Sequence, residues 1–95
     1  MFLFDLTYEK PLEEVDRLLP EHILYLDKWY AGGKFLCLGR KNPRTGGVIL
    51  CSCASLEEAE RIRDEDPFYR QGVARYVITE FFPSKAAEGF QALLH

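Results

Sequence analysis

Two side chains carry the acid–base chemistry that this sequence offers, His22 and Asp66. His22 lies within an apolar helical pattern, whereas the second histidine, His95, is the last residue. Imidazole is the only side chain whose unperturbed pKa lies near neutral pH, so a single internal histidine is a candidate proton acceptor. Asp66 precedes Pro67 and Phe68 and follows a charged helical segment. We expect His22 and Asp66 to be catalytic, with the imidazole moving a proton and the carboxylate fixing its tautomer.

Both residues also have a simpler structural interpretation. His22 could be a core histidine whose ring nitrogens bond to the backbone, or a partly exposed residue of a helix. An aspartate followed by proline is typical of a helix N-cap with proline in the first turn. A cap and a catalytic partner are compatible only if the Asp66 carboxylate reaches the imidazole, which the sequence does not show. Both interpretations therefore stay open.

The one local concentration of positive charge is the loop that contains Arg40, Lys41 and Arg44, which leads into a pair of glycines at 46–47. Glycine amides can approach a ligand closely, so the loop is a candidate anion site, although basic hairpin loops are often only solvated. Aromatic side chains could line a pocket for a planar molecule, or belong to the core or to a dimer interface. The residues that we expect to bind a substrate are Tyr8, Gly39, Arg40 and Phe68.

The cysteines indicate neither a disulfide framework nor a metal site. The chain has an odd number of cysteines, namely Cys37, Cys51 and Cys53, and no two of them have the Cys-x-x-Cys spacing. Two thiol ligands with a single distant histidine make a poor zinc site, so we expect no metal and no cofactor. Free cysteines are usually buried, and we expect three buried, reduced thiols, with a nucleophilic cysteine as the alternative.

Length and composition bound the class of protein. A chain of 95 residues with 47% hydrophobic residues can build one core, so residues 1–95 are expected to be a single domain. The net charge of -3 with dispersed basic residues argues against a nucleic-acid partner. No apolar run is long enough to span a bilayer, and no signal-like segment opens the sequence. We therefore expect a soluble, cytoplasmic protein with no membrane partner.

Hydrophobic periodicity predicts the elements that position these side chains. Residues 2–8 alternate as a half-buried strand, and 12–30 follow a helical period that Pro20 interrupts. Proline removes a backbone donor, so we expect the helix to break or kink there, with a short first helix and a longer one that restarts near Pro20. His22 would then lie in the first turn of the longer helix. The positive end of the helix dipole disfavours imidazolium there, which predicts a neutral ring.

The remaining signals complete a known order of elements. We expect a hairpin of strands 35–38 and 48–53, a helix from the Ser55 cap to about Glu65, a strand over 73–82 and a last helix after Ser84. The order β-α-β-β-α-β is that of a ferredoxin-like α+β domain with a four-stranded antiparallel sheet. Two helices cover one face of such a sheet. We expect the other face, with aromatics of the first and last strands, to pack on a second copy in a homodimer.

The sequence resembles the YciI-like, or YCII-related, family over nearly its whole length. The segments that carry the resemblance are Pro20-Glu21-His22, Gly33 to Gly39, Gly46 to Ile49, Ser55 to Ala59, Asp66-Pro67-Phe68 and Gly72-Val73. The resemblance implies a ferredoxin-like subunit that pairs into a dimeric α+β barrel, with a site built on His22 and Asp66. Similar proteins include a dehydrochlorinase that acts on a chlorinated hydroxyhydroquinone. The sequence departs from the family at Leu19, where many members have arginine, and at Arg40, where they have proline.

Two functions follow from these residues. The first is a small cofactor-independent enzyme, a lyase or isomerase or a dehydrochlorinase-like catalyst, which acts on a small aromatic or anionic metabolite through His22 and Asp66. The alternative is a non-catalytic module on the same dimeric scaffold that binds a small molecule or serves as an accessory or regulatory subunit. The absence of a second strong catalytic motif favours the module. A hydrogen bond between the two side chains beside a cleft would favour the enzyme.

Overall fold

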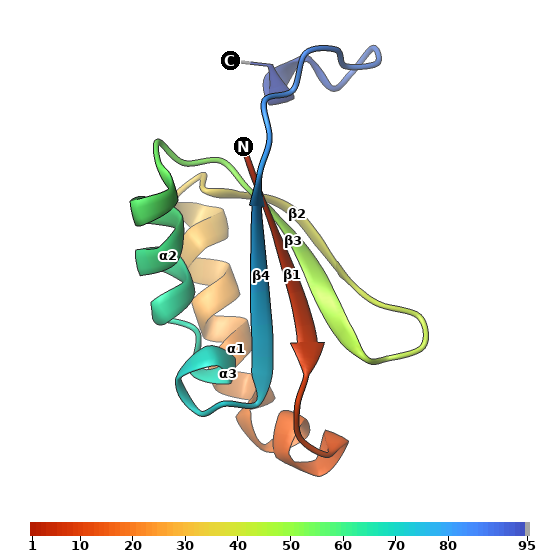
Figure 1. Cartoon of the computed structure of the whole chain (residues 1–95), viewed down its shortest axis with the longest axis vertical. Coiled ribbons are helices and arrows are strands. Elements are labelled where there is room, and N and C mark those ends of the chain that lie inside the picture. Colours follow the sequence, from red (N-terminus) through yellow and green to blue (C-terminus); the bar gives the residue numbers. More distant parts are fainter. Residues whose placement is uncertain (95) are drawn as a thin grey trace.

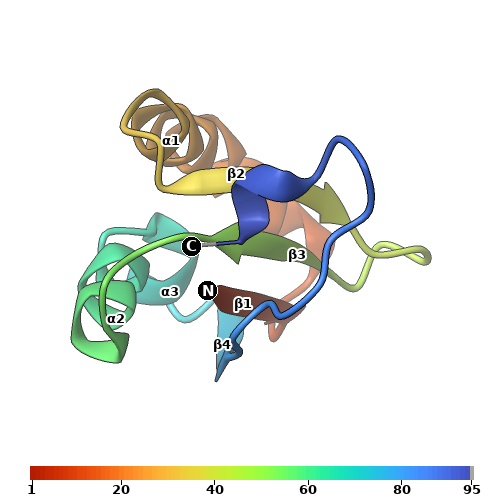
Figure 2. The ribbon, with the colours of Figure 1, turned by 90° about the horizontal axis from the view of Figure 1, so that it is seen from above.

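A computed structural model describes residues 1–94 of the chain. The elements in chain order are β1 (Phe2–Tyr8), α1 (Leu12–Ala31), β2 (Phe35–Arg40), β3 (Gly46–Cys51), α2 (Leu56–Asp64), α3 (Pro67–Arg70), β4 (Ala74–Glu80) and the 3₁₀ turn η1 (Gln91–Leu93). The four strands form one antiparallel sheet in the order β2-β3-β1-β4. Figures 1 and 2 show α1, α2 and α3 together on one face of this sheet. The expected β-α-β-β-α-β order is therefore confirmed, with α3 as an additional short helix.

The inner face of the sheet forms the core. In β1 the side chains of Phe2, Phe4 and Leu6 are buried and alternate with half-buried neighbours. Phe4 is opposite Ile49 of β3 and Ile78 of β4, so the apolar side chains of three strands form one row beneath the helices. A strand with this alternation places every second residue on the same face. The predicted pattern of residues 2–8 is confirmed.

Helix α1 is continuous, so of the two effects predicted for Pro20 the break into two helices is wrong. Pro20 leaves one helical carbonyl without its donor, but Val15 and Leu18 before it and Tyr25 after it are all buried against the core. Tertiary packing of both halves outweighs the lost bond. Figure 1 shows the first turns running at an angle to the rest, as expected for the predicted kink at an internal proline. His22 lies in the interior of α1, so the argument from a helix N-terminus does not apply to its ring.

Strands β2 and β3 form the predicted hairpin, with Leu38 opposite Ile49 and Arg40 opposite Gly47. The start of β3 requires glycine, because a Cβ at Gly46 would overlap the backbone carbonyl of Leu6 in the neighbouring strand. Close approach of two backbones is a characteristic reason for glycine in a strand. This close contact lies where β3 begins beside the central strand β1.

The face without helices differs from the expected one. Phe2, Phe4 and Tyr76 all lie on the helix side, so the prediction that this open face carries aromatics of β1 and β4 is wrong. Strand parity instead places aliphatic and polar side chains there. The open face consists of Leu3, Asp5 and Thr7 of β1, Val48 and Leu50 of β3, and Arg75, Val77 and Thr79 of β4. Among the described helices none is long and apolar enough to cross a membrane.

The expected helix after Ser84 is absent. Residues 81–94 are irregular apart from the single turn η1, and Figure 1 shows this tail beyond the end of the sheet. Gly89 has a φ of 91°, which interrupts a right-handed helix. Phe82 is 82% exposed and Phe90 is 59% exposed, so no burial stabilises an amphipathic helix. His95 lies outside the described residues.

The cysteines fit their expected environment only in part. Cys51 is buried, Cys53 is half-buried and Cys37 is exposed, so the prediction of three buried thiols is wrong for Cys37. Cys37 lies on the edge strand β2, opposite Leu50 and therefore on the face without helices. Burial raises the pKa of the Cys51 thiol to about 12. A buried thiol of this kind is a poor nucleophile.

Candidate active site

Asp66 begins the short helix α3. Its Oδ1 accepts the backbone N–H of Phe68 at 2.9 Å, and Pro67 occupies the first helical position, so the predicted N-cap is confirmed. The preceding helix α2 is capped in the same manner, with Ser55 Oγ accepting the N–H of Glu58 at 3.2 Å. These two caps mark where α2 and α3 begin. The Asp66 side chain is thereby held inside the core, where it is fully buried.

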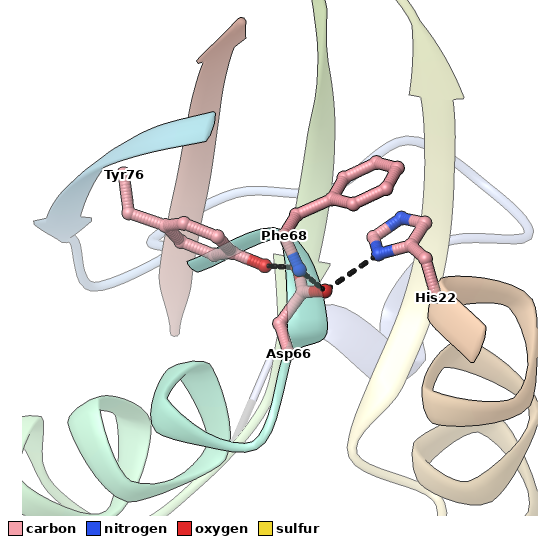
Figure 3. Close-up of polar contacts among 4 residues, drawn as sticks. All are labelled: His22, Asp66, Phe68 and Tyr76. Carbon is pink, nitrogen blue, oxygen red and sulfur yellow. Dashed lines mark hydrogen bonds and ion pairs between the residues drawn. The ribbon is translucent and has the colours of Figure 1, made fainter. Parts of the chain in front are cut away.

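The same carboxylate oxygen binds His22. The distance from Nδ1 of His22 to Oδ1 of Asp66 is 2.7 Å, and this bond joins α1 to α3 across 44 residues of sequence (Figure 3). His22 is only 8% exposed. A carboxylate accepts hydrogen bonds, so Nδ1 carries the proton in this pair. In the neutral ring Nε2 then has a free lone pair, and Figure 3 shows that nitrogen directed away from Asp66.

Tyr76 completes the environment of the carboxylate and was not among the predicted site residues. Its hydroxyl donates a short hydrogen bond to Oδ2 of Asp66 (Figure 3). Burial raises the pKa of Tyr76 well above its usual value, and the nearby charge of Asp66 raises it further. Tyr76 is therefore a donor at any physiological pH. Alternation along the last strand could have placed Tyr76 on the inner face, but no signal in the sequence pairs it with Asp66.

A second tyrosine lies beside this group. The hydroxyl of Tyr25, one turn after His22 on α1, is buried, lies near the Asp66 carboxylate and interacts with the hydroxyl of Tyr76. Burial raises its pKa strongly, and the charge of Asp66 contributes in the same direction. The interior of the protein thus contains one carboxylate surrounded by neutral donors, an arrangement that stabilises a buried charge without a cation.

Aromatic rings fix the plane of the imidazole. The ring of Phe68 stacks on His22 with centroids 3.9 Å apart and an interplanar angle of 4°. Tyr25 also faces the imidazole, at 6.0 Å and 28°. Stacked rings hold a side chain in one rotamer without blocking the edge that carries its nitrogens. His22 is therefore oriented by a hydrogen bond at one nitrogen and by ring packing.

His22 forms part of the wall of a cavity of about 160 Å³ between α1 and strands β1, β2 and β3. All four residues predicted to bind a substrate line this cavity, namely Tyr8, Gly39, Arg40 and Phe68. Asp66 and Tyr76 lie behind His22 and are not among its lining residues. The rest of the wall is apolar or glycine and consists of Leu6, Leu19, Ile23, Leu26, Leu38, Gly46, Gly47, Val48 and Ile49.

Of the three basic residues of the loop, one lines the cavity and the other two form ion pairs with carboxylates of the protein. Lys41 pairs with Asp5 at 2.6 Å, and Arg44 pairs with Asp16 at 2.6 Å. Both cations are thereby directed to protein carboxylates, and neither lines the cavity. Arg40 is the cation of this loop that remains at the cavity wall. Within residues 1–94 no group of three or more His, Cys, Asp or Glu side chains could hold a metal ion.

This geometry allows proton transfer. A neutral imidazole whose Nδ1–H is held by a carboxylate has its Nε2 available as a general base. The cavity beside it is lined mainly by apolar side chains and includes Arg40, whose guanidinium could bind an anion. The site thus combines a candidate general base, His22, a carboxylate that orients it, Asp66, and a small cavity.

Comparisons with known proteins agree with this fold. The YCII-related domain family matches residues 1–82. A search of curated proteins gives no match. Among solved structures, the chain is similar to 5-chloro-2-hydroxyhydroquinone dehydrochlorinase (TftG) from Burkholderia phenoliruptrix AC1100, determined in complex with 2,5-dihydroxybenzoquinone. The TM-score is 0.71 at 18% sequence identity, and the match covers 85% of this chain and 93% of the other. At this identity the likeness shows the fold, and the match over residues 1–82 shows that the chain belongs to the YCII-related family.

Proposed function

We propose that this protein is a small cofactor-independent enzyme in which His22 is the general base. In this proposal Nε2 of His22 takes a proton from a molecule in the cavity, and Asp66 holds the proton on Nδ1 and stabilises the imidazolium that forms. The observation that carries the proposal is the 2.7 Å bond between His22 and a fully buried carboxylate beside a cavity. A positioned base of this kind contributes about 10²- to 10⁴-fold in rate.

The substrate that we propose is a single planar ring with an anionic or ionisable oxygen. Apolar protein cavities of about 150 Å³ hold a benzene molecule, and this cavity measures about 160 Å³. The walls offer the aromatic faces of Tyr8 and Phe68 and the guanidinium of Arg40. TftG, which shares the fold, binds 2,5-dihydroxybenzoquinone, a ring of this description.

The reaction that we propose is elimination from such a ring. With a chlorinated hydroxyhydroquinone, His22 would take a hydroxyl proton and return it to the ring carbon that bears chlorine, which gives the keto tautomer. Removal of a second hydroxyl proton would then expel chloride from that carbon, with the net loss of HCl and a hydroxyquinone as product. The same imidazole would take and return the proton, and chloride leaves as the anion. This fits a cavity whose titratable lining residues, among those described, are Tyr8, His22 and Arg40.

The test is chloride release from 5-chloro-2-hydroxyhydroquinone and related halogenated rings, with His22→Gln as the variant. Glutamine keeps a donor towards Asp66 but has no basic nitrogen, so we expect turnover to fall about 10²- to 10⁴-fold. Glu21→Gln is the matched control, since Glu21 is the exposed neighbour of His22 on the same helix. Equal turnover by His22→Gln and the wild type would refute the catalytic role.

A non-catalytic module is the second candidate, and the lack of another catalytic side chain in the cavity wall favours it. Such a module would bind the ring without converting it. Thermal-shift titration with 2,5-dihydroxybenzoquinone, followed by mass spectrometry of the mixture, separates the two functions. Saturable binding of candidate rings without any new product would support the module and contradict the enzyme.

We also propose that two chains pair through the open face of the sheet, as in a dimeric α+β barrel. Val77 is 49% exposed there and is opposite Asp5 of β1, while Leu3 of β1 is opposite Leu50 of β3. The aliphatic side chains of this mixed face are favourable surface for a second copy. Light scattering should give twice the chain mass of 11.0 kDa, whereas the Val77→Lys variant should have the mass of one chain. A mass of 11.0 kDa for the wild type would exclude the pairing.

A further inference from the structure

We infer that Tyr76 is a positioning residue of the proposed active site, which acts on His22 through Asp66. The inference rests on the proposed role of His22 as a base. The geometry behind it is the division of donors between the two carboxylate oxygens. Oδ1 accepts both His22 Nδ1–H and the Phe68 N–H, whereas Oδ2 accepts the hydroxyl of Tyr76.

Two anchors at opposite oxygens fix the carboxylate. Asp66 has one soft torsion about its Cβ–Cγ bond, and the Phe68 amide alone holds only Oδ1. With Tyr76 bound at Oδ2, rotation about that bond breaks a hydrogen bond at both oxygens. The plane of the carboxylate is then constrained, and with it the direction in which Oδ1 meets the imidazole.

Tyr76 is itself held firmly. Its ring packs edge-on against Phe4, with centroids 5.7 Å apart, and against Tyr69 at 5.9 Å. Strand β4 fixes its backbone opposite Leu6 in the sheet. The burial that raises its pKa keeps the phenol protonated, so it donates to Oδ2 and never competes for the proton on His22. Tyr76 does not line the cavity and therefore cannot touch a substrate there.

The hydroxyl also sets how strongly Asp66 attracts the imidazole proton. A donor at Oδ2 withdraws charge from the carboxylate, because hydrogen bonds in one network polarise each other. Without that donor more charge remains on Oδ1, and the bond to Nδ1–H becomes stronger. Tyr76 thus tunes as well as orients the partner of His22.

The test is proton and nitrogen NMR of the substrate-free protein at neutral pH, comparing the wild type with Tyr76→Phe. The Nδ1–H resonance of His22, assigned by its loss in His22→Gln, should move downfield in Tyr76→Phe. Tyr69→Phe is the matched control, because Tyr69 packs against Tyr76 and has no side-chain bond to Asp66. An unchanged resonance in folded Tyr76→Phe, or an equal shift in Tyr69→Phe, would overturn the inference.

A second measurement keeps the inference testable if Tyr76→Phe does not fold. In the wild type the hydroxyl proton of Tyr76 should be visible and should exchange slowly with water, because a buried carboxylate holds it. A hydroxyl that exchanges as fast as that of an exposed phenol would contradict the contact. Both readouts are made without substrate. If the protein turned over no substrate, the proposed function would be refuted, whereas the two NMR measurements would still test the role of Tyr76.

Discussion

Replacement of Asp66 by alanine removes the acceptor of three donors at once. The Phe68 amide, the Tyr76 hydroxyl and the His22 Nδ1–H all bond to this carboxylate, and no part of it is exposed. The three donors differ in what they lose. His22 can move its proton to Nε2 and adapt at little cost. The other two cannot, so their loss determines the change in stability.

The magnitude follows from those two donors. Loss of a helix cap costs about 1 kcal/mol, and a buried donor left without a partner costs about 1–3 kcal/mol. We therefore expect Asp66→Ala to lower the free energy of unfolding by about 3 kcal/mol, which is in the range for breaking a buried charged network. For a domain of this size that corresponds to a decrease in Tm of about 12–24 °C.

The assay is urea unfolding at neutral pH with two comparison variants. Asp66→Asn keeps an oxygen for Phe68 and His22 and affects only the bond from Tyr76, so we expect a loss of about 1 kcal/mol. Asp64→Ala removes an exposed carboxylate that pairs with Arg63 at 3.0 Å, and we expect a change below about 0.5 kcal/mol. If Asp66→Ala were within 1 kcal/mol of Asp64→Ala at equal m-values, the assignment of the network would be refuted.

Three further predictions concern pH, packing and thiols. Cys51, with a pKa raised to about 12, Tyr25 and Tyr76 hold protons in the folded state that the unfolded chain loses at lower pH. These three groups should therefore leave stability unchanged between neutral pH and about pH 9 and lower it by up to about 1.4 kcal/mol per group and pH unit above that, as unfolding at a series of alkaline pH values would show. Gly46→Ala should unfold most of the protein by overlap with the Leu6 carbonyl, whereas Gly39→Ala, with no neighbouring atom within 4 Å of the new Cβ, should change Tm little; similar melting of both variants would disprove the close contact. Cys37 should be the fastest thiol to react with a disulfide reagent, and Cys51 should react only upon unfolding; equal rates would contradict the burial pattern.

Local signals in the sequence were sufficient for most of the elements. Alternation identified the first strand, and the caps at Ser55 and Asp66 identified where α2 and α3 begin, because each signal depends on neighbouring residues only. The helix break at Pro20 and the C-terminal helix were mispredicted. In the first case core packing outweighed a local penalty, and in the second an apolar pattern found no core to pack against.

The candidate site was predictable by residue type but not by contact. His22 and Asp66 were identified because histidine is rare in this chain and Asp-Pro is a distinctive pair. Their hydrogen bond depends on how α1 packs against α3, and the two residues are 44 positions apart in the sequence. The contribution of Tyr76 was invisible for the same reason, since a tyrosine on an inward strand position is most often only part of the core.

Phe68 serves the site through two chemically independent parts. Its amide belongs to the backbone and bonds to Asp66 whatever side chain is attached, whereas its ring alone lies flat on the imidazole at 3.9 Å. A change to leucine would therefore spare the helix start and alter the ring contacts with His22 and Tyr8 and one part of the cavity wall. The side chain at this position thus shapes the surroundings of the base, while the main chain at the same position secures the acid that orients it.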